Sequence, residues 1–174
     1  MVTGELVRLR PLEPEDADAF WRWHNDPDVV RWLVADYDES LAQIRRRFAE
    51  RGPNTYSNVA FGIETLAEGR LIGSCTLRDA SPETARAWFD LYIGEKDHWG
   101  GGFGTDATRT LCRYGFEMMR LHSIALWVVA ENAAAVRAYE KVGFRVDGRH
   151  RESFRGAGRW HDELLMSLLE GELT

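Results

Sequence analysis

Glycines cluster near the middle of the chain, between a segment with strand character and a segment with helix character. Residues 86–94 are rich in aromatic side chains, as strands often are, whereas residues 105–119 contain no proline and carry apolar side chains at helical spacing. We therefore expect a strand, a tight loop and a helix that begins directly after the loop. The loop consists of Trp99, Gly100, Gly101, Gly102, Phe103, Gly104 and Thr105.

Such a loop can bind an anion. Successive backbone N–H groups can face one point, and the helix behind them adds the positive end of its dipole. Glycine allows a phosphate to approach the backbone closely and tolerates positive φ. Taken alone, the segment could equally be an ordinary glycine-rich turn.

Two common phosphate loops do not fit the segment. A P-loop has Lys followed by Ser or Thr after its last glycine, whereas Gly104 is followed by Thr105 and Asp106. The dinucleotide pattern G-x-G-x-x-G, started at Gly100, would need a glycine at position 105. The loop therefore predicts a different phosphate-bearing ligand.

The remaining elements surround this strand, loop and helix. Alternating or β-branched apolar residues predict strands, and apolar residues at helical spacing predict helices. The run 124–129 is typical of a central strand that is buried on both faces and flanked by helices. Strands are expected at 6–10, 59–63, 71–77, 124–129, 145–155 and 159–169, and helices at about 14–25, 40–51 and 132–141.

Length and composition indicate one globular domain, residues 1–174. The chain has 174 residues, of which 44% are hydrophobic, and this is enough to build a core. The N-terminus has no apolar signal region and no apolar stretch could span a bilayer, so we expect a cytoplasmic protein without a membrane partner. The only cysteines, Cys75 and Cys112, are compatible with a reducing compartment.

Charge and histidine spacing argue against a nucleic-acid partner and against a metal site. A formal net charge of −6 argues against a nucleic-acid partner and slightly favours cationic substrates. The five histidines form no i, i+4 pair and have no cysteine nearby. We therefore expect no metal site.

A second constellation follows the 124–129 run. Together with the glycine loop, and in this order, it resembles the GNAT N-acetyltransferase superfamily, in particular the subgroup with ribosomal-protein N-terminal acetyltransferases and spermidine acetyltransferases. The resemblance covers essentially the whole chain and is strongest over residues 93–144. The constellation consists of Asn132, Ala135, Tyr139, Glu140, Lys141, Gly143 and Phe144.

The resemblance implies a fold of the α/β (α+β) class. It predicts a mixed, mostly antiparallel sheet of six to seven strands with helices on both faces. It also predicts a V-shaped splay between the two central strands, in which acetyl-CoA lies.

The resemblance also implies the cofactor contacts. The family signature Q/R-x-x-G-x-G/A wraps the pyrophosphate of acetyl-CoA, and here it corresponds to Trp99-x-x-Gly102-x-Gly104, with Trp99 departing from the usual first residue. The pantetheine arm would enter beside residues 91–93. The implied cofactor-binding residues are Leu91, Tyr92, Ile93, Trp99, Gly100, Gly101, Gly102, Phe103, Gly104, Thr105, Asn132 and Tyr139.

Tyr139 and Asn132 are the catalytic candidates that the resemblance implies. A hydroxyl directed at the thioester sulfur can protonate the departing thiolate, because the ordinary pKa values of a phenol and a thiol lie close together. The alternative for Tyr139 is an aromatic that packs its helix on the sheet. Asn132 would contact the pantetheine arm, cap the helix, or do both.

The acceptor side is less distinct in the sequence. The incoming amine must lose a proton, and Asp90, Glu95 and Glu64 lie near strands, but no base is assigned. By resemblance, the acceptor walls would include Trp23, Asn25, Trp32 and Phe154. The alternative is that these aromatics belong to the core.

We therefore expect an N-acetyltransferase that moves an acetyl group from acetyl-CoA to a primary amine by direct attack in a ternary complex. The acceptor is a small-molecule amine or a peptide N-terminus. The alternatives are a noncatalytic acyl-CoA binding or sensing module and a transferase that uses another acyl-CoA donor. A homodimer also stays open.

Overall fold

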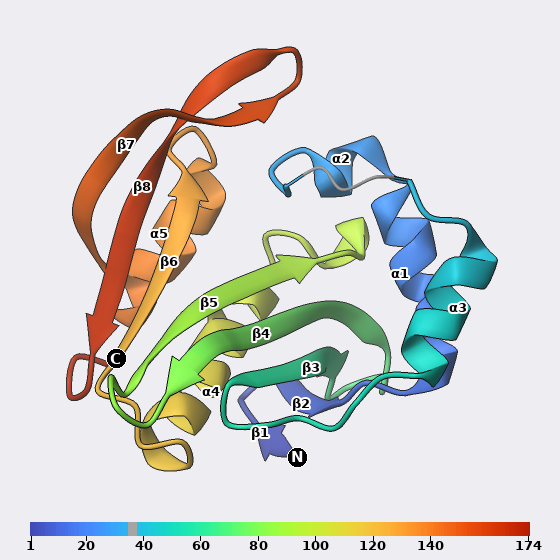
Figure 1. Ribbon diagram of the computed structural model, residues 1–174, viewed down its shortest axis with the longest axis horizontal. Helices are drawn as coiled ribbons and strands as arrows, with labels where there is room; N and C mark the ends of the chain where they lie inside the picture. The colour runs from blue at the N-terminus through green and yellow to red at the C-terminus, as the bar shows by residue number, and fades with distance from the viewer. Residues whose placement is uncertain (35–37) are drawn as a thin grey trace.

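The computed structural model describes residues 1–34 and 38–174, which form a single sheet with helices on both faces (Figure 1). The eight strands lie in the order β1-β2-β3-β4-β5-β6-β8-β7. They are β1 (Val2–Thr3), β2 (Val7–Pro11), β3 (Asn58–Thr65), β4 (Leu71–Ser81), β5 (Arg86–Ile93), β6 (Ser123–Val129), β7 (Arg145–Gly156) and β8 (Arg159–Leu169). The helices are η1 (Pro14–Asp16), α1 (Ala17–His24), α2 (Pro27–Val30), α3 (Leu41–Ala49), η2 (Lys96–His98), α4 (Phe103–Glu117) and α5 (Ala133–Val142).

The strand pairing confirms the expected class of sheet. All neighbouring strands are antiparallel except β5 and β6, which are parallel. The strand beyond the expected six or seven is β1, in which Val2 lies opposite Leu9. A strand of two residues carries too little alternation to be visible in the sequence.

The sheet splays between β5 and β6. These strands pair only from Arg86 opposite Ser123 to Trp88 opposite Ala125. Beyond this point β5 stays paired with β4 and β6 stays paired with β8, so the two strands diverge and the gap opens (Figure 1). The predicted V-shaped splay is confirmed.

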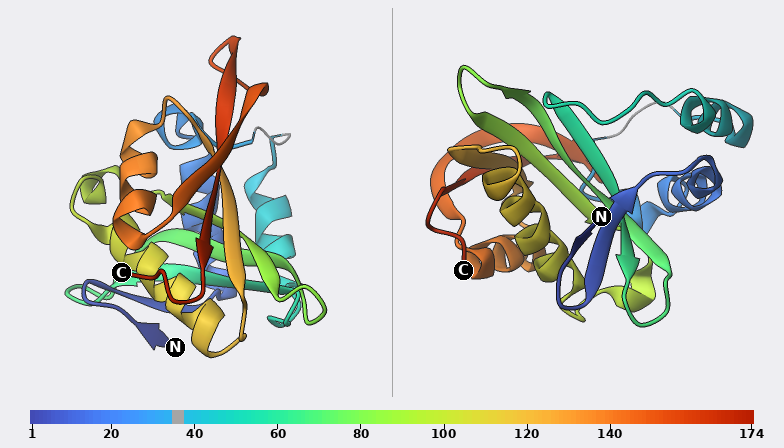
Figure 2. Two further views of the ribbon diagram at one scale, coloured as in Figure 1. Left: turned by 90° about the vertical axis from the view of Figure 1, so that its left-hand side faces the viewer. Right: turned by 90° about the horizontal axis from the view of Figure 1, so that it is seen from below.

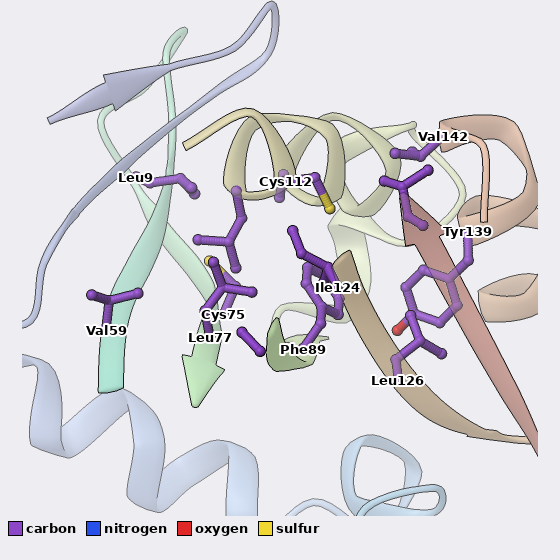
Figure 3. Packing of buried hydrophobic residues seen from close by; sticks show 14 of the residues in the cluster. Leu9, Val59, Cys75, Leu77, Phe89, Cys112, Ile124, Leu126, Tyr139 and Val142 are labelled. Atoms are coloured by element: carbon purple, nitrogen blue, oxygen red, sulfur yellow. The ribbon is translucent and has the colours of Figure 1, made fainter. Parts of the chain in front are cut away.

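Two hydrophobic clusters hold the helices to the sheet. The larger one packs α4 and α5 on one face and includes Cys112, Ile124 and Val142 (Figure 3). The smaller one packs α1 and α3 and includes Phe20 and Phe48. Figure 2 shows α4 and α5 on one side of the sheet and α1 and α3 on the other.

The prediction that residues 124–129 are buried on both faces is wrong at one position. Ile124, Leu126 and Val128 are buried against the helices, but Trp127 is 41% exposed. Helices therefore cover only one face of β6 at this point, and the other face is open. No helix of the described ranges is long and apolar enough to cross a membrane.

A buried carboxylate ties the start of the chain to α4. Asp106 lies in the first helical turn and accepts backbone hydrogen bonds from Glu5 at 3.1 Å, Leu6 at 2.8 Å and Val7 at 3.0 Å. Gly4 lies so close that a Cβ there would be 2.5 Å from one Asp106 oxygen. This contact holds the strand β2 against the helix that follows the glycine loop.

Candidate active site

A pocket with a volume of about 1080 Å³ lies across the splay. Its walls come from the diverging ends of β5 and β6, the glycine loop, α5, the segment around α2 and the β7–β8 hairpin. Most of the residues predicted from the sequence line it. They are Trp32, Leu91, Tyr92, Ile93, Trp99, Gly100, Gly102, Phe103, Gly104, Thr105, Asn132, Tyr139 and Phe154.

The glycine loop needs glycine at two positions. Gly100 has φ of 76° and Gly102 has φ of 85°, a left-handed conformation that side chains rarely adopt. Gly102 is the N-cap of α4, so the first helical N–H groups have no partner within the helix and are free to bind an anion. Gly101 does not line the pocket. A Cβ at this position would meet the Phe103 ring at 2.9 Å.

Trp99 stands where the family signature has Gln or Arg. Its indole Nε1 donates a hydrogen bond to the Ile93 carbonyl at 2.8 Å, and its side chain stays 46% exposed. The residue therefore fixes the loop to the end of β5. Next to it, the imidazole of His98 packs on Phe103 with the ring centres 5.0 Å apart.

Two basic side chains also line the pocket. Arg137 and Lys141 reach the pocket from α5. Sequence reasoning did not select them, although their spacing of four residues places them on one helix face. Cations, free amides and a helix N-terminus together fit the phosphates of acetyl-CoA.

Tyr139 lies between the core and the pocket. Its ring is 8% exposed and meets the Phe89 ring edge-on at 5.8 Å, so it also packs its helix, as the alternative interpretation expected (Figure 3). Burial raises the pKa of the Tyr139 hydroxyl well above its usual range, with a smaller contribution from Asp90. None of the described residues forms a hydrogen bond with this hydroxyl. At neutral pH the group keeps its proton and can donate it.

Asn132 caps α5 at the edge of the pocket. Its side-chain oxygen accepts a hydrogen bond from the backbone of Ala135 at 3.4 Å. Gly143 ends the same helix with φ of 111°. These two residues fix the length of α5 and hence the position of Tyr139 along it.

Two of the predicted acceptor residues lie outside the pocket. Trp23 is 2% exposed in the smaller core cluster and donates from Nε1 to Glu95 at 2.9 Å. Asn25 donates from its side chain to the backbone oxygen of Trp21 at 2.7 Å. For Trp23 the core interpretation is therefore correct, because α1 turns this face toward the sheet and not toward the splay.

The other two predicted acceptor residues, Trp32 and Phe154, line the pocket and contact the same histidine ring. The Trp32 ring meets the His161 ring edge-on at 5.4 Å, and Phe154 lies 6.0 Å from the same imidazole. His161 is buried between Glu131 at 3.2 Å and the Gly156 carbonyl at 3.1 Å. These ring contacts bring the segment after α2 against the β7–β8 hairpin at this part of the pocket.

The carboxylates considered as bases lie in different surroundings. Glu64 and Glu95 are each engaged by two arginines away from the pocket. Asp90 lines the pocket and pairs with Arg78 at 2.7 Å. Glu163 also lines it, and sequence reasoning missed this residue because only the register of β8 against β6 places it there.

The described part of the chain holds no cluster of His, Cys, Asp or Glu that could bind a metal ion. The buried cysteines, Cys75 and Cys112, lie in the core, where burial raises their thiol pKa values above the usual range. The chemistry of the site therefore depends on backbone amides, aromatic rings, a tyrosine hydroxyl and a few charged side chains.

A splayed sheet with a glycine loop at a helix N-terminus defines an acyl-CoA-dependent transferase of the GNAT type. The sequence model described as an acetyltransferase (GNAT) domain matches residues 7–145. The chain belongs to this family, whose members use acetyl-CoA, and it is an N-acetyltransferase.

Several relatives have similar length. An N-acetyltransferase called p20 of Bacillus licheniformis is 28% identical over 97% of this chain and 95% of its own. The spermidine N(1)-acetyltransferase of Escherichia coli K12 is 26% identical over 98% of this chain and 89% of its own. The crystal structure of spermidine N-acetyltransferase from Vibrio cholerae with CoA and spermine aligns with a TM-score of 0.83 at 26% identity, over 95% of this chain and 96% of that one.

Proposed function

We propose that this protein transfers the acetyl group of acetyl-CoA to a primary amine of a small molecule by direct attack in a ternary complex. The observation that carries the proposal is the continuity of the pocket. The glycine loop, Tyr139, Trp32 and Phe154 all line one cavity. Donor and acceptor can therefore be bound at the same time.

The donor half offers three kinds of contact. The amides that follow Gly102 and the cations of Arg137 and Lys141 would bind the phosphates. Beyond Trp88, the edge of β5 that faces β6 has no strand partner, so its backbone groups are available to the amides of a pantetheine arm. Leu91 and Ile93 would line this path.

Tyr139 would act as the proton donor. When bound, acetyl-CoA would supply the acetyl group as a thioester, and the departing sulfur needs a proton. Burial keeps the Tyr139 hydroxyl protonated, and contacts with Phe89 and Phe144 fix its ring. Asn132 would act by holding the first turn of α5. Tyr139 lies further along the same helix.

The shape of the acceptor half favours a small molecule over a polypeptide. The contact between Trp32 and His161 joins two walls that would otherwise form an open groove. Relatives named for spermidine agree with a small amine. The other function class is a noncatalytic acyl-CoA binding module. Such a module would not need the part of the pocket lined by Trp32 and Phe154.

The test is Tyr139→Phe, assayed by thiol release from acetyl-CoA with a panel of primary amines. The phenylalanine keeps the ring contacts, so we expect acetyl-CoA affinity to stay unchanged while kcat falls by about 100-fold or more. The matched control is Tyr114→Phe, because Tyr114 packs on Phe61 outside the pocket.

Unchanged kcat in Tyr139→Phe would remove the proton-donor role. If acetyl-CoA binds but no amine or peptide releases thiol, the binding-module interpretation would replace the proposal. Release with free peptide N-termini and not with small amines would instead identify a protein acceptor.

A further inference from the structure

The open face of the sheet carries two stacked tryptophans. Trp88 on β5 and Trp127 on β6 point away from α4 and α5, with ring centres 6.4 Å apart and planes inclined by 15°. The His150 ring lies 5.9 Å from Trp127. Trp127 and His150 line the same pocket as Trp32 and Phe154. The stack thus presents an electron-rich aromatic surface to whatever binds there.

A carboxylate lies on the same face. In the β6–β8 ladder Trp127 is opposite Leu165, and Glu163 is two residues along, opposite Val129. Because side chains alternate along a strand, Glu163 points to the side on which Trp127 lies. The Ser153 hydroxyl donates to Glu163 Oε2 at 2.8 Å and holds the carboxylate in place.

Glu163 differs from the other carboxylates of the pocket. Asp90 is paired with Arg78, and Asp28 is paired with Lys96. Within the ranges 1–34 and 38–174, Glu163 forms no ion pair, and its only side-chain partner is neutral. A half-buried carboxylate without a cation is costly unless a ligand supplies the positive charge.

We propose that Trp127 and Glu163 form an ammonium subsite that selects the acceptor. The inference rests on the proposed function and adds a requirement to it. A carboxylate and an aromatic face both stabilise the charged form of an amine, whereas the nitrogen that attacks the acetyl group must be neutral. The nitrogen held by Trp127 and Glu163 is therefore not the attacking one, and the acceptor carries a second, permanently protonated nitrogen.

Binding to the CoA-loaded protein tests the subsite without turnover. Calorimetry compares diamines from 1,3-diaminopropane to 1,6-diaminohexane with monoamines of the same carbon number. At least one diamine should bind about tenfold or more tightly than its monoamine. Glu163→Gln keeps the Ser153 contact but removes the charge, and Trp127→Leu removes the aromatic face. Each should abolish the preference for the diamine, with CoA affinity unchanged.

The control is Glu170→Gln, which removes the same charge from an exposed position just beyond β8 and outside the pocket. This variant should keep the wild-type preference. Two results would overturn the subsite: no diamine binds more tightly than its monoamine, or the preference survives in Glu163→Gln. Failure of the proposed function looks different, because CoA-loaded protein would then still select diamines while acetyl-CoA releases no thiol with any amine.

Discussion

Asp106→Ala should destabilise the protein strongly, although the residue lies away from the pocket. The carboxylate is 4% exposed and accepts three backbone hydrogen bonds from the chain start. Alanine removes all three acceptor contacts at once. It also removes a negative charge from the first turn of α4, where that charge complements the helix dipole.

The three donors do not contribute equally. Val7 is fully buried, so its N–H would lose a charge-assisted hydrogen bond without access to water, at a cost of about 1.5–3 kcal/mol. Glu5 and Leu6 are exposed, and water can replace the lost acceptor for their N–H groups at a smaller cost. With the dipole contribution, the free energy of unfolding should fall by about 3 kcal/mol. For a chain of this length the midpoint should then fall by about 6–12 °C.

Urea and thermal unfolding followed by circular dichroism measure this difference. Asp106→Asn is the informative intermediate, because one amide oxygen can keep the two bonds made by Oδ2 and lose only the one to Glu5. The exposed Asp147→Ala should change the free energy of unfolding by less than about 0.5 kcal/mol. A loss below about 1 kcal/mol in Asp106→Ala would refute the assignment of Asp106 as the anchor of α4.

Two further predictions concern the buried hydroxyls of Thr110 and Tyr139. The Oγ1 of Thr110 is buried with no hydrogen-bond partner in the described ranges, so Thr110→Val should raise the free energy of unfolding in urea by about 1 kcal/mol; a loss of stability would show that the hydroxyl is satisfied. Because burial raises the pKa of Tyr139, its proton should remain up to about pH 10, and kcat with saturating amine should not fall as the pH approaches that value. A fall near pH 9 that disappears in Tyr139→Phe would contradict this reasoning.

Local patterns were sufficient to predict the elements that form the proposed donor half of the site. The strand before the loop, the loop itself and the helix after it are contiguous, so the glycines and the start of α4 follow from neighbouring residues. The same holds for α5, because Asn132 and Gly143 are recognisable helix ends. The splay followed from the family resemblance, since no residue pattern states where two paired strands separate.

The acceptor half could not be predicted in this way, because distant segments form it. Trp23 and Trp32 lie close together in the sequence, yet Trp23 is in the core and Trp32 lines the pocket. Trp23 is in the core because α1 turns it toward the sheet. Glu163 reaches the pocket only through the register of β8 against β6. Trp127 appeared buried because its neighbours along β6 are apolar.

The two halves of the pocket also differ in what determines their chemistry. The proposed donor half would bind through backbone amides and helix geometry, which a substitution on the open face of the sheet leaves intact. The proposed acceptor half would depend on side chains such as Trp127 and Glu163, which lie on strands whose buried residues form part of the core. If the proposed subsite is correct, exchanging the Trp127 and Glu163 side chains changes which amine is bound without moving the loop or Tyr139. Acceptor choice would then vary on this fold independently of acetyl-CoA binding, because the loop and α5 that would bind the coenzyme lie outside the two strands that carry Trp127 and Glu163.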